Sequence, residues 1–223
     1  MKKQLIIMAI LCAIALTSNA QTEKGQNLIG GAIGFSSNKA TQPANTNGSN
    51  NRTTSFSISP RYGHFFAKNL AIGIVAGYIN NKTTYDYTQT TANTVLSQDY
   101  IKTHEFNVGP YLRYYVDIVD KFKFYGQFNA SIGFGKGNNT YSPINVQLST
   151  IDTKLNSYNV GITPGFAFFP AKRWAIEFSF PLVAYNKQTT KYQVSNSELK
   201  YTSEAFSSGI SSFNPSIGLN FHF

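Results

Sequence analysis

The feature that most constrains this chain is a regular alternation of large apolar side chains with small or polar ones. In segment 213–223 every odd position is apolar and every even position is small or polar. Because successive side chains of a β-strand point to opposite faces, this segment has one apolar and one polar face. The alternation recurs at 122–135, 157–168 and 174–182, and no segment keeps the 3.6-residue period of a helix. We therefore predict one all-β domain.

Four prolines mark an internal repeat. Pro60, Pro110, Pro164 and Pro215 are 50, 54 and 51 residues apart, and each precedes an aromatic pair or the terminal aromatics. A hairpin unit that is repeated four times in the sequence predicts eight strands. The partner strands are expected near 27–37, 70–80, 122–135 and 174–185. Since proline cannot donate a ladder hydrogen bond, we expect a local bulge or a widened pairing at each of the four.

The connections alternate in length. Segments 67–69, 117–121 and 170–173 are short polar turns, whereas 38–54, 81–101, 136–153 and 186–204 are long and rich in Asn, Thr, Ser and Lys. We predict the latter four as long loops. Short turns at one end and long loops at the other are typical of a transmembrane β-barrel with both termini on the periplasmic side.

The sidedness of the strands separates a membrane barrel from a water-soluble, ligand-binding one. The face of small and polar side chains is too narrow and too wet to be the core of a soluble barrel. Both solvents are satisfied if this face lines the lumen and the bulky apolar face meets lipid. We therefore predict an eight-stranded antiparallel up-and-down transmembrane β-barrel. Eight strands enclose only enough room for side chains, so the lumen should be packed and polar.

The amino terminus predicts export. Lys2 and Lys3 precede an apolar run at 5–16, and small residues at Ser18 and Ala20 come before a cleavage site, so 1–20 is predicted to be a removed signal peptide and 21–223 the barrel. The one cysteine, Cys12, falls in the removed segment, which excludes disulfides and thiol catalysis. Removing two of 19 cations leaves 17 against 10 acidic residues. These basic residues are scattered, so no nucleic acid partner is expected.

Several charged residues occupy strand positions whose side chains are predicted to point into the lumen. They form a predicted lumen charge network of Arg61, Glu105, Arg113, Lys123 and Glu177. Because a buried charge is unfavourable unless it is paired, we expect Glu177 to meet Arg61 or Arg113 near the periplasmic end. An internal salt-bridge plug and a proton or ion path are both compatible with these residues.

The candidate catalytic bases are the three histidines, His64, His104 and His222. Only His104 lies near the predicted outer rim, and Phe106 stands two residues on where a lipid deacylase has a serine. A base beside a nucleophile is therefore not recognisable. Three dispersed histidines also lack the spacing of a metal site. We expect no enzyme activity, no catalytic residue, no cofactor and no metal.

The predicted loops carry an excess of positive charge. These segments contain nine cations and five carboxylates. The cations are Lys39, Arg52, Lys82, Lys102, Lys136, Lys154, Lys187, Lys191 and Lys200. Such residues can bind lipopolysaccharide phosphates or can form an ordinary solvated surface. Tyrosines in the same segments add contact area for adhesion or for another extracellular ligand.

The chain resembles the OmpX-like and OmpA-like porin-family group of bacterial outer-membrane β-barrel proteins. The resemblance is carried by segments 59–73, 109–115, 164–169 with 172–174, and 216–223. It implies an outer-membrane location and an assembly signal at Gly218, Phe221 and Phe223, read by the barrel assembly machinery. It implies a structural role in the envelope among outer-membrane lipids, with a small-solute porin and a lipid-modifying enzyme as alternatives. We expect the last strand to close the barrel against the first near Leu28 to Phe35.

Overall fold

The computed structural model describes residues 22–41, 48–89, 94–143, 149–194, 197–209 and 216–223; the predicted signal peptide and Pro215 lie outside them. The described residues form ten strands. In chain order they are β1 (Asn27–Ala40), β2 (Gly48–Ala67), β3 (Leu70–Gln89), β4 (Thr94–Val119), β5 (Phe122–Pro143), β6 (Ser149–Ala171), β7 (Trp174–Ser179), β8 (Val183–Val194), β9 (Ser197–Ser208) and β10 (Ser216–His222). Within these residues, no helix is long and apolar enough to cross a membrane.

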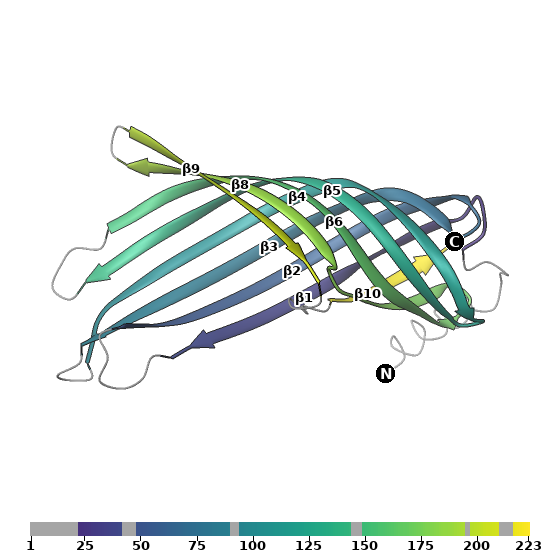
Figure 1. The fold of residues 1–223 in the computed structure, drawn as a ribbon, viewed down its shortest axis with the longest axis horizontal. Helices are drawn as coiled ribbons and strands as arrows, with labels where there is room; N and C mark the ends of the chain where they lie inside the picture. The colour runs from purple at the N-terminus through teal and green to yellow at the C-terminus, as the bar shows by residue number, and fades with distance from the viewer. Residues whose placement is uncertain (1–21, 42–47, 90–93, 144–148, 195–196, 210–215) are drawn as a thin grey trace, which may run out of the picture.

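Eight of the strands close into a ring. Neighbouring strands from β1 to β7 pair in an antiparallel manner, and β10 pairs with both β7 and β1 (Figure 1). The closing register runs from Leu28 opposite His222 to Ile33 opposite Ile217, which is the contact predicted for the last strand. A closed ring leaves no unpaired edge in this half of the barrel. The predicted eight-stranded antiparallel barrel is confirmed.

Two positions in the wall are each shared by two strands. β7 and β8 share the seventh position, and β10 and β9 share the eighth. Along β6, residues Gly165–Ala171 pair with β7, whereas Thr153–Ile162 pair with β8. The continuous strand predicted over 174–185 is therefore wrong: it breaks at 180–182, because Pro181 has no N–H to donate. Beyond the break, β9 pairs with β8, and the register of β1 with β10 ends at Ile33.

The strand prolines interrupt the pairing on one side without a bulge. Pro60 pairs with Gly31 of β1, but the β2–β3 register is interrupted between Ile58 and Arg61 and resumes unshifted. Pro110 behaves in the same way. It pairs with β3, but the register between β4 and β5 has no pair at Pro110. At each site one neighbour keeps the ladder and the other is lost locally, because proline lacks the N–H. The bulges expected at these positions are absent from the described residues.

Most of the four predicted long loops are strand. We call these segments the crown, and they comprise 37–40, 48–55, 80–89, 94–104, 136–143, 149–156, 186–194 and 197–204. Threonine and tyrosine favour extended backbone, and hydroxyls of opposed threonines lie close together, with Thr53 and Thr83 3.1 Å apart. The polar composition that indicates a loop thus belongs to paired strands with polar side chains on both faces.

The opposite end of the barrel, which we call the turn end, has the three short connections that the sequence predicts. They are Lys68–Asn69, Asp120–Lys121 and Lys172–Arg173, between the ends of paired strands. Asn69 has a φ of 62°, a left-handed conformation that asparagine tolerates better than most residues. The C-terminus lies at this end (Figure 1).

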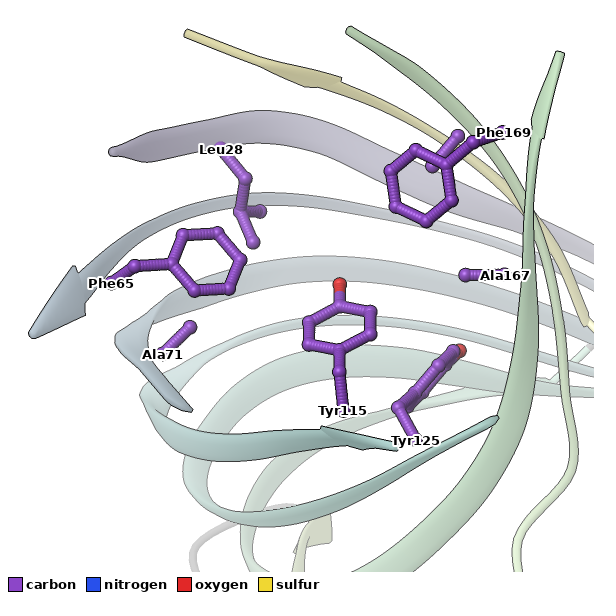
Figure 2. Close-up of a cluster of buried hydrophobic side chains, with 8 residues drawn as sticks. Leu28, Phe65, Ala71, Tyr115, Tyr125, Ala167 and Phe169 are labelled. Atoms are coloured by element: carbon purple, nitrogen blue, oxygen red, sulfur yellow. The ribbon is translucent and has the colours of Figure 1, made fainter. Parts of the chain in front are cut away.

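The two faces of the wall differ as predicted. Large apolar side chains point outward, with Ile33, Phe106 and Phe134 each more than half exposed. Inward side chains are buried, and a cluster at the turn end fills the lumen (Figure 2): Leu28, Phe65, Ala71, Tyr115, Tyr125, Ala167, Phe169 and Ala175. An apolar exterior with a filled lumen is the sidedness of a membrane barrel.

The closing register can be tested by cross-linking. Ile33 and Ile217 are directly opposed, and the one cysteine of the sequence, Cys12, lies in the predicted signal peptide. Ile33→Cys with Ile217→Cys should therefore form a disulfide on mild oxidation. The control, Ile33→Cys with Leu219→Cys, is two residues out of register and should stay reduced. Gel migration with and without reductant measures both. Equal cross-linking of the two pairs would contradict the register.

Candidate functional site

Three charges from distant parts of the chain meet inside the lumen. Arg61 on β2, Arg113 on β4 and Glu177 on β7 all lie on the inward phase of their strands. Arg113 Nη1 donates to Glu177 Oε1 over 2.6 Å, and Arg61 Nη1 donates to Glu177 Oε2 over 3.0 Å. The carboxylate is thus shared by two guanidinium groups, and the contact predicted from the sequence occurs with both arginines.

Tyrosines and a glutamine complete the environment of Arg113. Its Nε and Nη2 donate to Gln127 Oε1 over 3.0 and 2.6 Å. The guanidinium carbon lies 4.2 Å from the ring centre of Tyr125, a favourable cation–π position. Tyr115 and Tyr125 hydroxyls donate to Glu177 over 3.2 and 3.3 Å. Nearly every polar atom of this pair therefore has a partner, as a buried charge requires.

A glycine slot allows a further ring to reach the group. Gly63 on β2 and Gly73 on β3 are directly opposed, and a Cβ at either would lie 2.2 to 2.6 Å from atoms of Tyr111. Only glycine permits this approach of the tyrosine to the wall. The Tyr111 ring lies 5.6 Å from the guanidinium carbon of Arg113. We call Arg61, Arg113, Glu177, Tyr111, Tyr115 and Tyr125 the plug.

Below the plug, towards the turn end, aromatic rings fill the lumen. His222 is fully buried, with ring centres of Phe169, Phe65 and Tyr115 at 5.2, 5.7 and 6.5 Å. Phe65 and Phe169 point inward (Figure 2), while the adjacent Phe66 and Phe168 point outward and are exposed. We call Leu28, Phe65, Phe169 and His222 the floor. Doubled aromatics in a strand place one ring on each face, which is the sequence signal that could have predicted it.

The plug and floor leave a small polar space on the crown side. A cavity of about 220 Å³ is bounded by both arginines of the plug, Tyr125, Gln127 and polar side chains of the wall. A space of this size holds water or a small polar solute. The tilted and edge-on rings of the floor and the paired charges of the plug lie between this cavity and the turn end.

Of the five charges predicted to face the lumen, Arg61, Arg113 and Glu177 meet in the plug, and the other two lie at other heights. Lys123 Nζ contacts Asp117 at the turn end and donates to Thr22 Oγ1 over 3.1 Å. Glu105 accepts a 2.5 Å bond from Ser157 Oγ and is eight residues from Arg113 on β4, about 27 Å along the strand. The strand phase predicts the face on which a side chain lies, but it does not predict the height.

The histidines occupy three separate places. His64 Nδ1 lies 3.0 Å from Asn27 Oδ1 at the turn end, and His222 belongs to the floor. His104 lies on β4 opposite Asn80 and Lys136. No group of three metal-ligating side chains occurs among the described residues. The expected absence of enzyme activity stays a prediction.

The three residues of the predicted assembly signal lie on β10 or directly after it. Gly218 faces the lumen, where a Cβ would meet the Gly31 carbonyl oxygen at 3.0 Å. Phe221 lies between Trp174 and Phe223, with ring centres at 5.0 and 5.9 Å. The backbone of Phe223 exchanges two hydrogen bonds with Asn27. These contacts attach the chain end to β1; recognition by assembly machinery stays a prediction.

Comparisons with known proteins agree with this geometry. Residues 19–182 match the family described as outer membrane protein beta-barrel domain. The chain belongs to this family, and its location is the cell outer membrane. Among solved structures it is similar to OprG of Pseudomonas aeruginosa, with 14% identity over 91% of this chain and 97% of that chain and a TM-score of 0.53. Ail of Yersinia pestis has 15% identity over 90% and 99%, with a TM-score of 0.37. A comparison with curated proteins finds no match.

Glu177 should be indispensable to the stability of the barrel. Glu177→Gln leaves two buried guanidinium groups without a counter-charge, so we expect the free energy of unfolding to fall by about 3–5 kcal/mol. The control Glu105→Gln, whose carboxylate bonds to Ser157, should lose only about 1 kcal/mol. Urea unfolding in detergent, followed by the fluorescence of the single tryptophan, Trp174, measures both. Similar losses in the two variants would be incompatible with the special role of Glu177.

Proposed function

We propose that this protein is a closed barrel with a structural role in the outer membrane, and that its crown is a surface for contact with ligands or lipids. The observation that carries the proposal is the plug. Glu177 is held by two arginines within a ring too narrow for an aqueous channel. A lumen committed to internal pairing supports a scaffold function rather than a conducting one.

The crown supports the second half of the proposal. Eight strand segments continue beyond the apolar belt and carry most of the exposed lysines. A paired, extended surface loses less conformational entropy on binding than free loops would, because its backbone is already ordered. Adhesion, an extracellular ligand and lipopolysaccharide are the partner classes that such a surface favours.

A small-solute transporter is the second candidate, and one observation favours it. In the described residues, Gly34–Ala40 of β1 pair only with β2, and β9 pairs only with β8. Among the described residues, no ladder therefore joins β1 to β9 on the crown side of Ile33. A solute entering from the crown would leave sideways, since the plug lies below. A lipid-modifying enzyme has no comparable observation in its favour.

Electrical recording tests the proposed function. The purified protein, folded as judged by heat-modifiable gel migration, should conduct no ions above background in planar bilayers, because the plug and floor fill the lumen. A large open porin inserted in the same bilayers serves as the positive control. Steady unitary conductance from the folded protein would contradict a sealed barrel.

A further inference from the structure

A ring of aromatic residues marks one boundary of the apolar belt. Each of eight strands contributes one outward aromatic at the base of the crown: Phe35, Phe56, Tyr78, Phe106, Phe134, Tyr158, Tyr185 and Phe206. Several are directly opposed across strands, including Tyr78 with Phe106 and Phe106 with Phe134. Aromatic girdles of this kind lie at the membrane–water interface of outer-membrane barrels. We call these residues the aromatic ring.

The height of the belt agrees with this assignment. On β4 the outward face is apolar from Val116 to Phe106. Those ten residue steps extend about 34 Å along the strand, or about 25 Å along the barrel axis at the usual tilt. This is the height of the apolar band of a transmembrane barrel, so the crown begins where the hydrocarbon ends.

A second band, of cations, lies beyond the aromatic ring. β8 has two basic residues in the crown, and one of them, Lys187, pairs with Glu204 over 2.6 Å. Apart from Lys187, each of the same eight strands has one basic residue there: Lys39, Arg52, Lys82, Lys102, Lys136, Lys154, Lys191 and Lys200. On β1 to β4 the cation lies four residues beyond the aromatic, about 13 Å along the strand and about 10 Å along the axis. That height falls in the polar headgroup layer of the leaflet. We call these residues the cation band.

The cation band opposes like charges directly. Lys39 lies opposite Arg52, and Lys82 opposite Lys102. On the other side of the barrel Lys136, Lys154, Lys191 and Lys200 form an unbroken row across four neighbouring strands. Like charges directly opposed across strands are destabilising. A repeated arrangement of this kind is therefore unfavourable for the free protein and favourable when an anion lies between the cations.

The protein itself neutralises only part of this charge. Lys191 pairs with Glu198 over 2.8 Å, and the hydrogen bond from Lys191 lowers the pKa of Glu198, which keeps that carboxylate ionised. By contrast, Lys39, Arg52, Lys82 and Lys102 form no ion pair with a carboxylate of the described residues. The four cations on β1 to β4 are available to an external anion.

A hollow lies at three of these four cations. It has a volume of about 440 Å³ and is lined by polar and charged side chains of β1 to β4, including Lys39, Arg52, Lys82 and the carboxylate of Asp86. Lys82 Nζ also lies 5.4 Å from the ring centre of Tyr100. A guanidinium fork and two ammonium groups converging on one concave surface suit phosphate oxygens, which accept several charge-assisted bonds at once.

We propose that the cation band binds the phosphate groups of lipopolysaccharide in the outer leaflet. Its principal site is the hollow lined by Lys39, Arg52 and Lys82, together with Lys102, which lies directly opposite Lys82. The inference rests on the proposed function, because it requires the crown to lie on the outer side of the membrane. The position of the band favours a membrane lipid over a soluble polyanion. Its cations lie at headgroup height beside the aromatic ring, where the acyl chains of the same lipid can pack on the belt.

Lipid binding by the folded, purified protein tests this proposal. The variant Lys82→Gln with Lys102→Gln removes one opposed pair. The matched control Lys24→Gln with Lys68→Gln removes the same charge at the turn end, where Lys68 is well exposed. Titration in neutral micelles with lipopolysaccharide should show about a 30-fold loss of affinity for the first variant and none for the control. Dephosphorylated lipopolysaccharide should bind the native protein weakly, and added salt should weaken the native interaction.

The unfolding temperature in lipid-free micelles gives a second readout with the opposite sign. Removing an opposed cation pair should leave this temperature unchanged or raise it, whereas the stabilisation by lipopolysaccharide should shrink. If the double variant does not fold, Lys39→Gln with Arg52→Gln makes the same test. Unchanged affinity in the band variants, or equal affinity for dephosphorylated lipopolysaccharide, would overturn the proposal. Equally tight, band-dependent binding of a heparin oligosaccharide would also overturn it in favour of a soluble polyanion. Heat-modifiable migration and silent bilayers would meanwhile leave the proposed function intact.

Discussion

The narrowness of an eight-stranded ring is the constraint on which the rest of this structure depends. Its lumen admits side chains but little water, so a charge that faces inward must find its counter-charge there. Glu177 finds two, Arg61 and Arg113, from strands on the far side of the ring. These ion contacts join β7 to β2 and to β4 across the lumen. Tyrosines and the aromatic floor occupy the space that these charges leave.

The exterior is ordered by a different pair of solvents. Lipid accounts for the apolar belt and for the aromatic ring at its boundary. We propose that the headgroup layer accounts for the cation band beyond it. Because the strands continue into the crown, cations far apart in sequence become neighbours, as Lys136, Lys154 and Lys191 are. The interior of the barrel thus pairs its charges internally, while the exterior leaves many of its charges available to the membrane.

Alternation alone predicts much of this molecule. The proline repeat predicts eight wall positions, and the phase of Glu177 and Arg113 predicts their contact. Alternation does not predict height, so it does not show that Glu105 and Lys123 lie apart from the plug. Crown strands resemble loops in composition, because polar side chains on both faces of a strand remove the apolar signal. The opposed cations become visible only from the register, since Lys82 and Lys102 lie near the two ends of one segment that the sequence predicts as a loop.

The coupling between Arg113 and Glu177 tests the central claim most directly. A double-mutant cycle of Arg113→Met and Glu177→Leu, read by urea unfolding, measures the interaction free energy of Arg113 with Glu177. The cycle separates this coupling from the other effects that each single substitution has on stability. If the paired charges hold the closed lumen, the double variant will be more stable than the sum of the single effects predicts, by about 2–3 kcal/mol. Additive effects, with a coupling near zero, would contradict the account.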